Sequence, residues 1–220
     1  MTTRPRARSR HAPRSSEGTS REESKELTRA ALLRAALKLL SRSSFDSISL
    51  REVTREAGIS PTAFYRHFDD MEELGLVLVE QSFGMLSDML RSARTDAAHC
   101  PDAIRGSVDV VVRHVAEHET HMRFIARERY GGVRRIRRAI RRELQLFADE
   151  LALDLAVFPV VREWPPEDRR MYAGLIAEIM VHMVAELLEA DAGERELLQQ
   201  RTVDQMRLVS LAIPTWRPAR

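Results

Sequence analysis

Apolar residues recur every three or four positions through most of the chain beyond residue 23, and the strict alternation typical of half-buried strands is scarce. This pattern predicts an all-α fold. The first helix is expected from Leu27 to Leu40. The sequence Ser49-x-x-Glu52 is typical of a capping box, in which each residue's side chain bonds the other's backbone. It therefore predicts the start of a second helix, from Leu50 to Ala57.

A similar sequence, Asp70-x-x-Glu73, predicts the start of a longer helix that joins two domains. Beyond it, Gly131-Gly132 and Gly193 divide the chain into further helices, the last two of which are expected at about 167–189 and 195–212. We expect three parts: an arm over residues 1–23, a helix-turn-helix domain over residues 24–72 and a larger helical domain over residues 73–216.

The arm over residues 1–23 is polar, contains two prolines and is rich in arginine, so it cannot build a core. We expect it to be disordered and basic. Such arms contact phosphates or the minor groove in other helix-turn-helix proteins, and the alternative is a solvated tail.

The segment from Ser49 to Phe68 predicts a helix, a three-residue turn and a second helix. Gly58 can adopt the left-handed backbone that ends the first helix, Ser60 can cap the second, and Pro61 suits its first position. This is the geometry of a DNA-reading helix-turn-helix, and an ordinary helical hairpin is the alternative.

In the second helix of this segment, Phe64 and Phe68 are four positions apart and should face the core together. Thr62 and Ala63 should face outward and are small enough to approach a major groove closely, whereas Arg66 can donate to phosphates. The residues that we predict to contact DNA are Arg51, Ser60, Pro61, Thr62, Ala63, Tyr65, Arg66 and His67.

The block from Leu27 to Leu74 resembles the amino-terminal domain of TetR-family repressors, above all in the string Gly-Ile-Ser-Pro-Thr-Ala-Phe-Tyr-Arg-His-Phe. In detail it is most similar to the fatty-acid-responsive DesT/FabR subfamily, which shares Pro-Thr-Ala-Phe-Tyr-Arg-His-Phe. The resemblance implies that Thr62, Ala63 and Tyr65 meet bases or adjacent phosphates, and that His67 meets a phosphate.

One departure from the family concerns the start of the fourth helix. Many relatives carry a lysine there, where this chain has Met71 beside Asp69 and Asp70. The departure puts a phosphate contact at this point in doubt, and the basic arm is the expected compensation.

A homodimer is expected because a helix-turn-helix monomer contacts only a few bases, and useful specificity needs two half-sites. The resemblance implies pairing through the last two helices as a four-helix bundle. The alternative is that the apolar stripes of these helices complete the monomer core. The stripe residues are Ile176, Ile179, Met180, Met183, Leu187, Leu198, Val203, Met206, Val209 and Ile213.

Aliphatic residues between the linking helix and the last two helices either line an apolar tunnel or form a packed core, and periodicity does not separate the two. Because the corresponding domain of the DesT/FabR subfamily holds a long-chain acyl thioester, the resemblance implies an acyl-CoA effector. The apolar residues predicted to contact it are Val111, Val115, Phe124, Ile140, Leu144, Phe147, Ile176 and Met180.

Arginine pairs repeat at helical spacing over residues 134–142, with Ile136 and Ile140 turned inward. On the outer side, Arg134, Arg138 and Arg141 share one face. We predict that these three bind the phosphates of coenzyme A, because guanidinium grips phosphate in a bidentate way. The alternative is a solvated helix face.

His114, His118 and His121 have a spacing that suits a metal on an unbroken helix, but a new helix beginning at Glu119-Thr120 would turn His121 away. We therefore predict no metal site. Phosphate-binding glycine loops, zinc-protease motifs and nucleophile elbows are absent from the sequence, so we expect neither a catalytic residue nor a cofactor.

Composition bears on location and partners. The single cysteine, Cys100, excludes an intramolecular disulfide and suits a reducing cytosol. No run approaches the eighteen or so apolar residues that a membrane span requires, and the first residues lack an apolar leader, so a cytoplasmic protein without membrane contact is expected. The net charge is only +2, but the pI of about 9.0 leaves local basic regions for a polyanion.

Together these features predict a homodimeric repressor that binds palindromic double-stranded operator DNA. The resemblance implies control of desaturase or unsaturated fatty acid genes in response to long-chain acyl-CoA, with saturated and unsaturated chains acting in opposite directions. The alternatives are control of efflux or catabolic genes by another small hydrophobic ligand, and a ligand-binding protein that no longer binds DNA.

Overall fold

The computed structural model describes residues 16–97 and 102–216, and within these ranges the chain forms helices and no strand. None of these helices has both the length and the apolar character needed to cross a membrane. The amino-terminal helices are α1 (Ser16–Leu40), the short 3₁₀ helix η1 (Phe45–Ser47), α2 (Leu50–Ala57) and α3 (Pro61–Phe64). The others are α4 (Met71–Ala97), α5 (Ala103–Glu117), α6 (Glu119–Glu128), α7 (Arg134–Leu155), α8 (Pro159–Arg162), α9 (Pro166–Leu187) and α10 (Ala192–Ser210).

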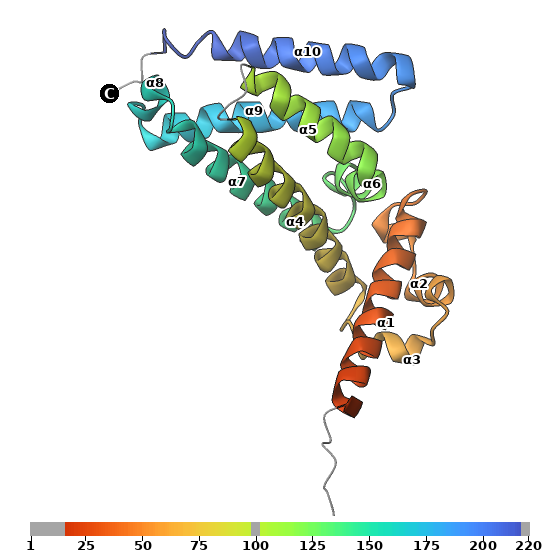
Figure 1. The fold of residues 1–220 in the computed structure, drawn as a ribbon. Coiled ribbons are helices and arrows are strands. Elements are labelled where there is room, and N and C mark those ends of the chain that lie inside the picture. Colours follow the sequence, from red (N-terminus) through yellow and green to blue (C-terminus); the bar gives the residue numbers. More distant parts are fainter. Residues whose placement is uncertain (1–15, 98–101, 217–220) are drawn as a thin grey trace, which may run out of the picture.

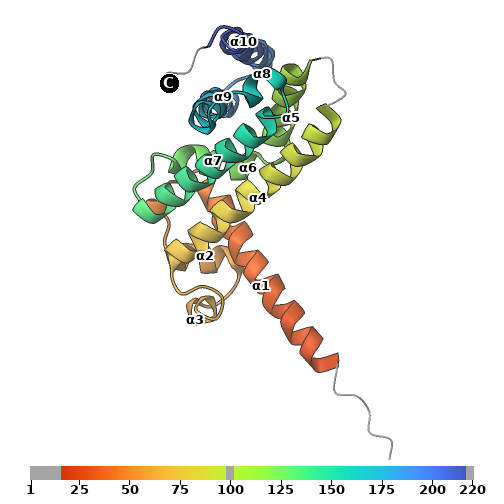
Figure 2. The same cartoon turned by 90° about the vertical axis from the view of Figure 1, so that its left-hand side faces the viewer.

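The helices form two lobes joined by α4 (Figure 1). Helices α1 to α3 make the smaller lobe, and α5 to α10 make the larger one. In the larger lobe α4 lies beside α7, and α7 packs on α9 (Figure 2). The paired helices α9 and α10 lie at the end of the molecule opposite α3.

The first helix is longer than we predicted: it begins at Ser16 and not at Leu27, so residues 16–23 of the expected disordered arm are helical. Our prediction followed apolar periodicity, which is absent before Leu27. The segment 17–26 is instead rich in glutamate, with one lysine and one arginine, and such residues extend a helix by propensity alone. Residues 1–15, which carry most of the arm's arginines, and Cys100 lie outside the described residues.

The core of the small lobe continues into the large lobe. Phe45 and Phe64 are buried in one cluster with Phe124 of α6 and Ile136 of α7. Close packing at this joint needs a glycine, because a Cβ on Gly75 of α4 would lie 2.6 Å from the Ile136 Cδ1 and 2.7 Å from the Phe45 Cζ. The two lobes are therefore mechanically connected through apolar packing.

The stripes that we assigned to a dimer interface face the interior. Ile176, Met183 and Leu187 of α9, with Val203 and Met206 of α10, are buried in the second core cluster. This is the alternative in which the stripes complete the monomer core. The physical reason is that α5 and α7 both pack on the α9–α10 side of the lobe and need an apolar surface there.

Candidate nucleic-acid interface and internal cavity

The helix-turn-helix forms as the local sequence predicts. The Ser49 Oγ accepts from the Glu52 backbone N–H at 3.3 Å, and the Glu52 carboxylate accepts from the Ser49 N–H at 2.9 Å, which completes the capping box. Gly58 has φ +71° and ends α2 in the left-handed region. Ser60 caps α3, accepting from the Ala63 N–H at 3.3 Å.

Helix α3 is shorter than we expected, because a tighter turn replaces its last residues. The His67 N–H donates to the Phe64 carbonyl oxygen at 2.9 Å, which is an i to i+3 bond of 3₁₀ type. Phe64 and Phe68 are still buried side by side, with ring centroids 5.5 Å apart. Arg29 of α1 lies 4.5 Å from the centre of the Phe68 ring and donates to the His67 carbonyl oxygen at 2.9 Å, which fixes the turn on α1.

Most of the predicted DNA-contacting side chains are exposed. The exposed ones are Arg51, Ser60, Pro61, Thr62, Tyr65 and Arg66. Ala63 and His67 are half-buried. Burial first, and then the charges of Lys25 and Arg29, lower the pKa of His67, so this imidazole is neutral at pH 7. It can therefore donate one hydrogen bond to a phosphate but brings no charge.

The acidic residues before α4 have structural roles. The Asp70 Oδ1 accepts from the Glu73 N–H at 2.7 Å and so caps α4 as predicted, whereas the Glu73 carboxylate bonds the Asp69 N–H and not that of Asp70. Arg135 of α7 lies 3.8 Å from Asp70 and 3.2 Å from Glu72, measured between nitrogen and carboxylate oxygen. One arginine of the 134–142 run thus offsets the acidic start of α4.

A cavity of about 1040 Å³ occupies the larger lobe, between α4, α5, α6, α7, α9 and α10. Its lining is mainly apolar, which is typical of sites for hydrophobic small molecules. The predicted ligand-contacting residues that line it are Val111, Leu144, Phe147, Ile176 and Met180.

The other predicted ligand-contacting residues lie elsewhere. Val115 is buried in the second core cluster, and Phe124 and Ile140 are buried in the first. The arginines that we expected at the cavity entrance, Arg134, Arg138 and Arg141, are exposed and do not line the cavity. The cavity follows the later half of α7, from Leu144 to Leu155, whereas the arginines occupy its first half opposite the buried Ile136 and Ile140.

Sequence reasoning missed several lining residues because helical periodicity marks them only as inward-facing. The polar or charged ones include Ser82, His114, Arg129 and Tyr172. Of these His114 carried a visible signal, a histidine among valines on the inner face of a helix, which we considered only as a metal ligand.

The three histidines do not converge. Helix α5 ends at Glu117 and α6 begins at Glu119, so the helix is broken as we expected. The rings of His114 and His118 lie in contact but tilted by 48°, with centroids 4.5 Å apart, whereas the His121 Nδ1 lies 2.9 Å from the Ser82 Oγ. Within the described residues no group of three or more histidine, cysteine or acidic side chains has metal-binding geometry.

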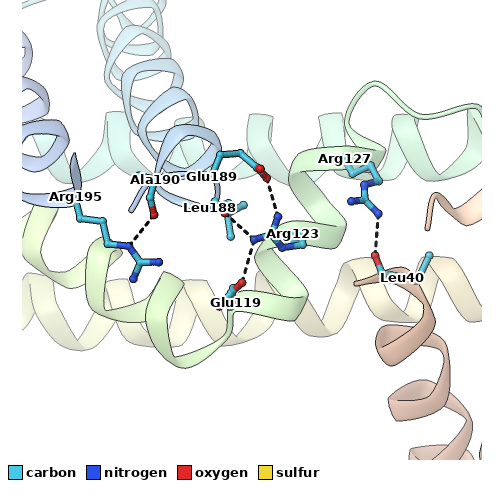
Figure 3. A network of polar contacts seen from close by, with 8 residues as sticks. All are labelled: Leu40, Glu119, Arg123, Arg127, Leu188, Glu189, Ala190 and Arg195. Carbon is cyan, nitrogen blue, oxygen red and sulfur yellow. Dashed lines mark hydrogen bonds and ion pairs between the residues drawn. The ribbon is translucent and has the colours of Figure 1, made fainter. Parts of the chain in front are cut away.

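Helix α6 holds both lobes through arginines (Figure 3). Arg123 donates to the Glu189 carboxylate at 2.7 Å and to the Leu188 carbonyl oxygen at 2.6 Å, at the turn between α9 and α10. One turn later, Arg127 donates to the carbonyl oxygens of Leu40 at 3.1 Å and Ser43 at 2.8 Å, where α1 ends. A shift of α6 would therefore be felt in the small lobe.

Glu128, the last residue of α6, strengthens this contact. Its Oε1 accepts from the Phe45 backbone N–H at 2.8 Å, while its Oε2 is buried and has no hydrogen-bond partner among the described residues. Burial raises the pKa of Glu128. A buried carboxyl group at the joint of the lobes makes that joint sensitive to small displacements.

The chain thus combines an exposed helix-turn-helix with a helical lobe that contains an apolar cavity. The model of one family, described as "Bacterial regulatory proteins, tetR family", matches residues 32–76, which span α1 from Leu32 to the first turns of α4. The match covers the helix-turn-helix lobe, so this part of the chain is similar to bacterial regulatory proteins of the tetR family.

Solved structures of TetR-type regulators share this fold over most of the chain. The fatty acid degradation regulator FadR from Bacillus halodurans is 16% identical, with 82% of this chain and 96% of that chain covered and a TM-score of 0.63. NalD, the secondary repressor of the MexAB-OprM multidrug efflux pump in Pseudomonas aeruginosa, is 20% identical (84% and 97% covered, TM-score 0.61). A tetR-family transcriptional regulator from Streptomyces coelicolor is 19% identical (87% and 84% covered, TM-score 0.66).

Proposed function

We propose that this protein is a homodimeric transcriptional repressor whose affinity for a palindromic operator changes when an apolar molecule fills the cavity. The observation that carries the proposal is the position of α6. Ile125 and Ala126 line the cavity, and the next two residues, Arg127 and Glu128, bond the end of α1 and the segment that follows it. A ligand that fits one position of α6 better than another would shift the equilibrium between two arrangements of the small lobe.

The dimer is supported by an apolar patch on the outer face of α9 and α10. Met171 and Leu175 are exposed near the start of α9, and Leu208 and Leu211 are exposed near the end of α10. The Tyr172 hydroxyl lies 2.7 Å from the Ser210 Oγ, so the two helix ends that carry these four exposed side chains are neighbours. We call these side chains the α9–α10 patch, and we place the second protomer there because exposed apolar clusters mark interaction sites.

For the ligand, the finer proposal from the sequence is a long-chain acyl-CoA that controls desaturase or unsaturated fatty acid genes. It is supported by the shared recognition string and by a long apolar cavity that can accept an acyl chain. The arginines that we assigned to the coenzyme A phosphates are not part of the lining. Arg129, which is part of it, is already paired with Glu178 at 2.7 Å.

The alternative ligand is a smaller hydrophobic molecule without a phosphate-rich head, and the target genes are then efflux or catabolic ones. The pairing of Arg129 on the lining with Glu178 favours it, because this guanidinium is then not free to bind the phosphates of coenzyme A. Control of DNA binding by the cavity is proposed for either class of ligand, and the two classes differ in their response to acyl-CoA.

The test is binding of the purified protein to the promoter region beside its own gene, measured by gel shift. Palmitoyl-CoA, oleoyl-CoA, dodecanol or no addition would be compared, with DNA of unrelated sequence as competitor. Ala177→Phe, which fills part of the cavity from α9, should reduce the response to any ligand. Ala192→Phe, an exposed position on α10 away from the lining, should leave it unchanged.

Specific binding that one of these molecules changes, and that Ala177→Phe makes insensitive, supports ligand control. If the two thioesters act in opposite directions, the fatty acid proposal stands as well. Failure to bind any fragment of that promoter in preference to the competitor would contradict the repressor proposal itself.

A further inference from the structure

The cavity has an exposed apolar end and a buried polar end. Val157 and Phe158, between α7 and α8, and Val160 of α8 line it and are each at least half exposed, so they are part of its rim. Ser82 of α4 and His114 of α5 line it and are fully buried. Along α7 alone the lining extends from Leu144 to Leu155, which corresponds to about 16 Å at 1.5 Å per residue.

His114 is the unusual group of this lining. Its side chain is 1% exposed, and neither ring nitrogen has a hydrogen-bond partner among the residues whose side chains the structure describes, 22–87 and 102–216. Burial is the main cause that lowers the pKa of His114 to about 4, and the charges of nearby histidines lower it further. The ring is therefore neutral at pH 7. A neutral imidazole has one N–H donor and one nitrogen acceptor, and here both are unused.

The other fully or nearly fully buried polar side chains of the lining already have partners. The Ser82 hydroxyl donates to the Leu78 carbonyl oxygen at 2.7 Å and lies 2.9 Å from the His121 Nδ1. The Tyr172 hydroxyl bonds Ser210. Leaving a buried polar group unpaired costs free energy, so an unpaired group beside a cavity indicates that its partner is the molecule that fills the cavity.

The surroundings also select the kind of partner. Arg129 is held by both oxygens of Glu178, at 2.9 and 2.7 Å, so it is not free to neutralise a buried anion. Burying an unpaired charge in an apolar site is far more costly than burying a hydrogen-bonded neutral group. A neutral head such as a hydroxyl or an undissociated carboxyl can donate to the unprotonated nitrogen of His114 or accept from its N–H, and so would pair one of the two nitrogens.

We propose that the cavity binds a single-chain amphiphile head first, with a small uncharged polar head against His114 and its apolar tail directed to the rim at Val157, Phe158 and Val160. This inference rests on the proposed ligand control and names the ligand's chemistry. It differs from the acyl-CoA proposal, in which the large polar head would remain at the entrance.

Calorimetric titration of the full-length protein with dodecanol, dodecane, dodecanoic acid and lauroyl-CoA tests it. Dodecanol should bind about tenfold more weakly to His114→Phe than to the wild type, because a hydrogen bond is lost. Dodecane, which has neither a donor nor an acceptor, should bind both proteins with similar affinity. His114→Gln keeps a donor and an acceptor and should retain most of the affinity for dodecanol.

His182→Phe is the matched control, since this histidine is exposed on α9 and does not line the cavity. Dodecanoic acid distinguishes a hydroxyl head group from an undissociated carboxyl head group. If it binds as tightly as dodecanol, the site accepts both head groups. If it binds much more weakly, the site accepts only the hydroxyl. Unchanged dodecanol affinity in His114→Phe, or tighter binding of lauroyl-CoA than of dodecanol, would overturn the inference. If the inference is overturned but these molecules still alter operator binding, the proposed ligand control stands. If none of them binds the protein, the proposed ligand control fails as well.

Discussion

Arg127 of α6 donates a hydrogen bond to the carbonyl oxygen of Leu40, the last residue of α1, at 3.1 Å (Figure 3). The last carbonyls of a helix have no partner within the helix, and a cation there also interacts favourably with the helix dipole. The contact therefore stabilises the end of α1 and makes its position depend on α6, one face of which lines the cavity.

We expect Arg127→Met to uncouple the two lobes. Operator affinity without ligand should change by only a few-fold. The ratio of the operator affinities measured with and without ligand should become about tenfold smaller. The free energy of unfolding should drop by about 1–3 kcal/mol, because two carbonyl oxygens lose their donor. Gel shifts with and without ligand, and urea unfolding, measure the two effects. Arg113→Met, at an exposed position on α5, is the control, and a full ligand response in Arg127→Met would contradict the coupling role.

The salt dependence of DNA affinity distinguishes residues that contact phosphates from residues that contact bases. Arg66→Ala should weaken binding to all sequences alike and reduce the slope of log affinity against log salt by about 1, because one phosphate contact is lost. Thr62→Val should instead change the preference among operator variants and leave that slope unaltered. Anisotropy titrations over a range of salt concentrations decide this, and the reverse pattern would show that the two roles are wrongly assigned.

Leu208→Glu places a charge in the α9–α10 patch and should convert the dimer to a monomer, because an unpaired charge would be buried at the interface. Sedimentation velocity should show the halved mass, and operator affinity should fall at least a hundredfold because one half-site is lost. Leu153→Glu is the control, since this leucine of α7 is 71% exposed, compared with 68% for Leu208. A Leu208→Glu protein that remains dimeric would place the interface elsewhere.

His114 should make the protein less stable in mild acid. The unfolded chain takes up a proton below the ordinary pKa of 6.5, whereas the folded protein resists it until about pH 4, so stability is lost as the pH falls through this window. The nearby titrating groups are His118, Glu117 and His121. The loss from pH 7 to pH 5 is about 2 kcal/mol from the size of the shift, and urea unfolding at the two pH values measures it.

The same measurement on His114→Phe should show a smaller loss of stability over that range, because the substituted side chain does not titrate. His182→Phe should keep the wild-type dependence. An identical loss in all three proteins would assign the acid sensitivity to other groups.

The helix-turn-helix could be predicted in detail because its determinants are local. The mutual bonds of Ser49 and Glu52, the left-handed backbone of Gly58 and the cap at Ser60 each involve residues within a few positions of one another. The early start of α1 was missed because a helix held by propensity has no apolar face to reveal it. The tightening at the end of α3 was missed because it depends on Arg29 of another helix.

The sequence by itself determined the all-α fold, the positions of α2, α9 and α10 and the outward display of Thr62 and Arg66, since periodicity and caps are properties of neighbouring residues. Only the tertiary structure decided the rest. An inward-facing residue such as Phe147, Phe124 or Ile176 has the same helical spacing whether it meets a cavity or a packed core, because that outcome depends on which distant helices pack around it and how closely they approach.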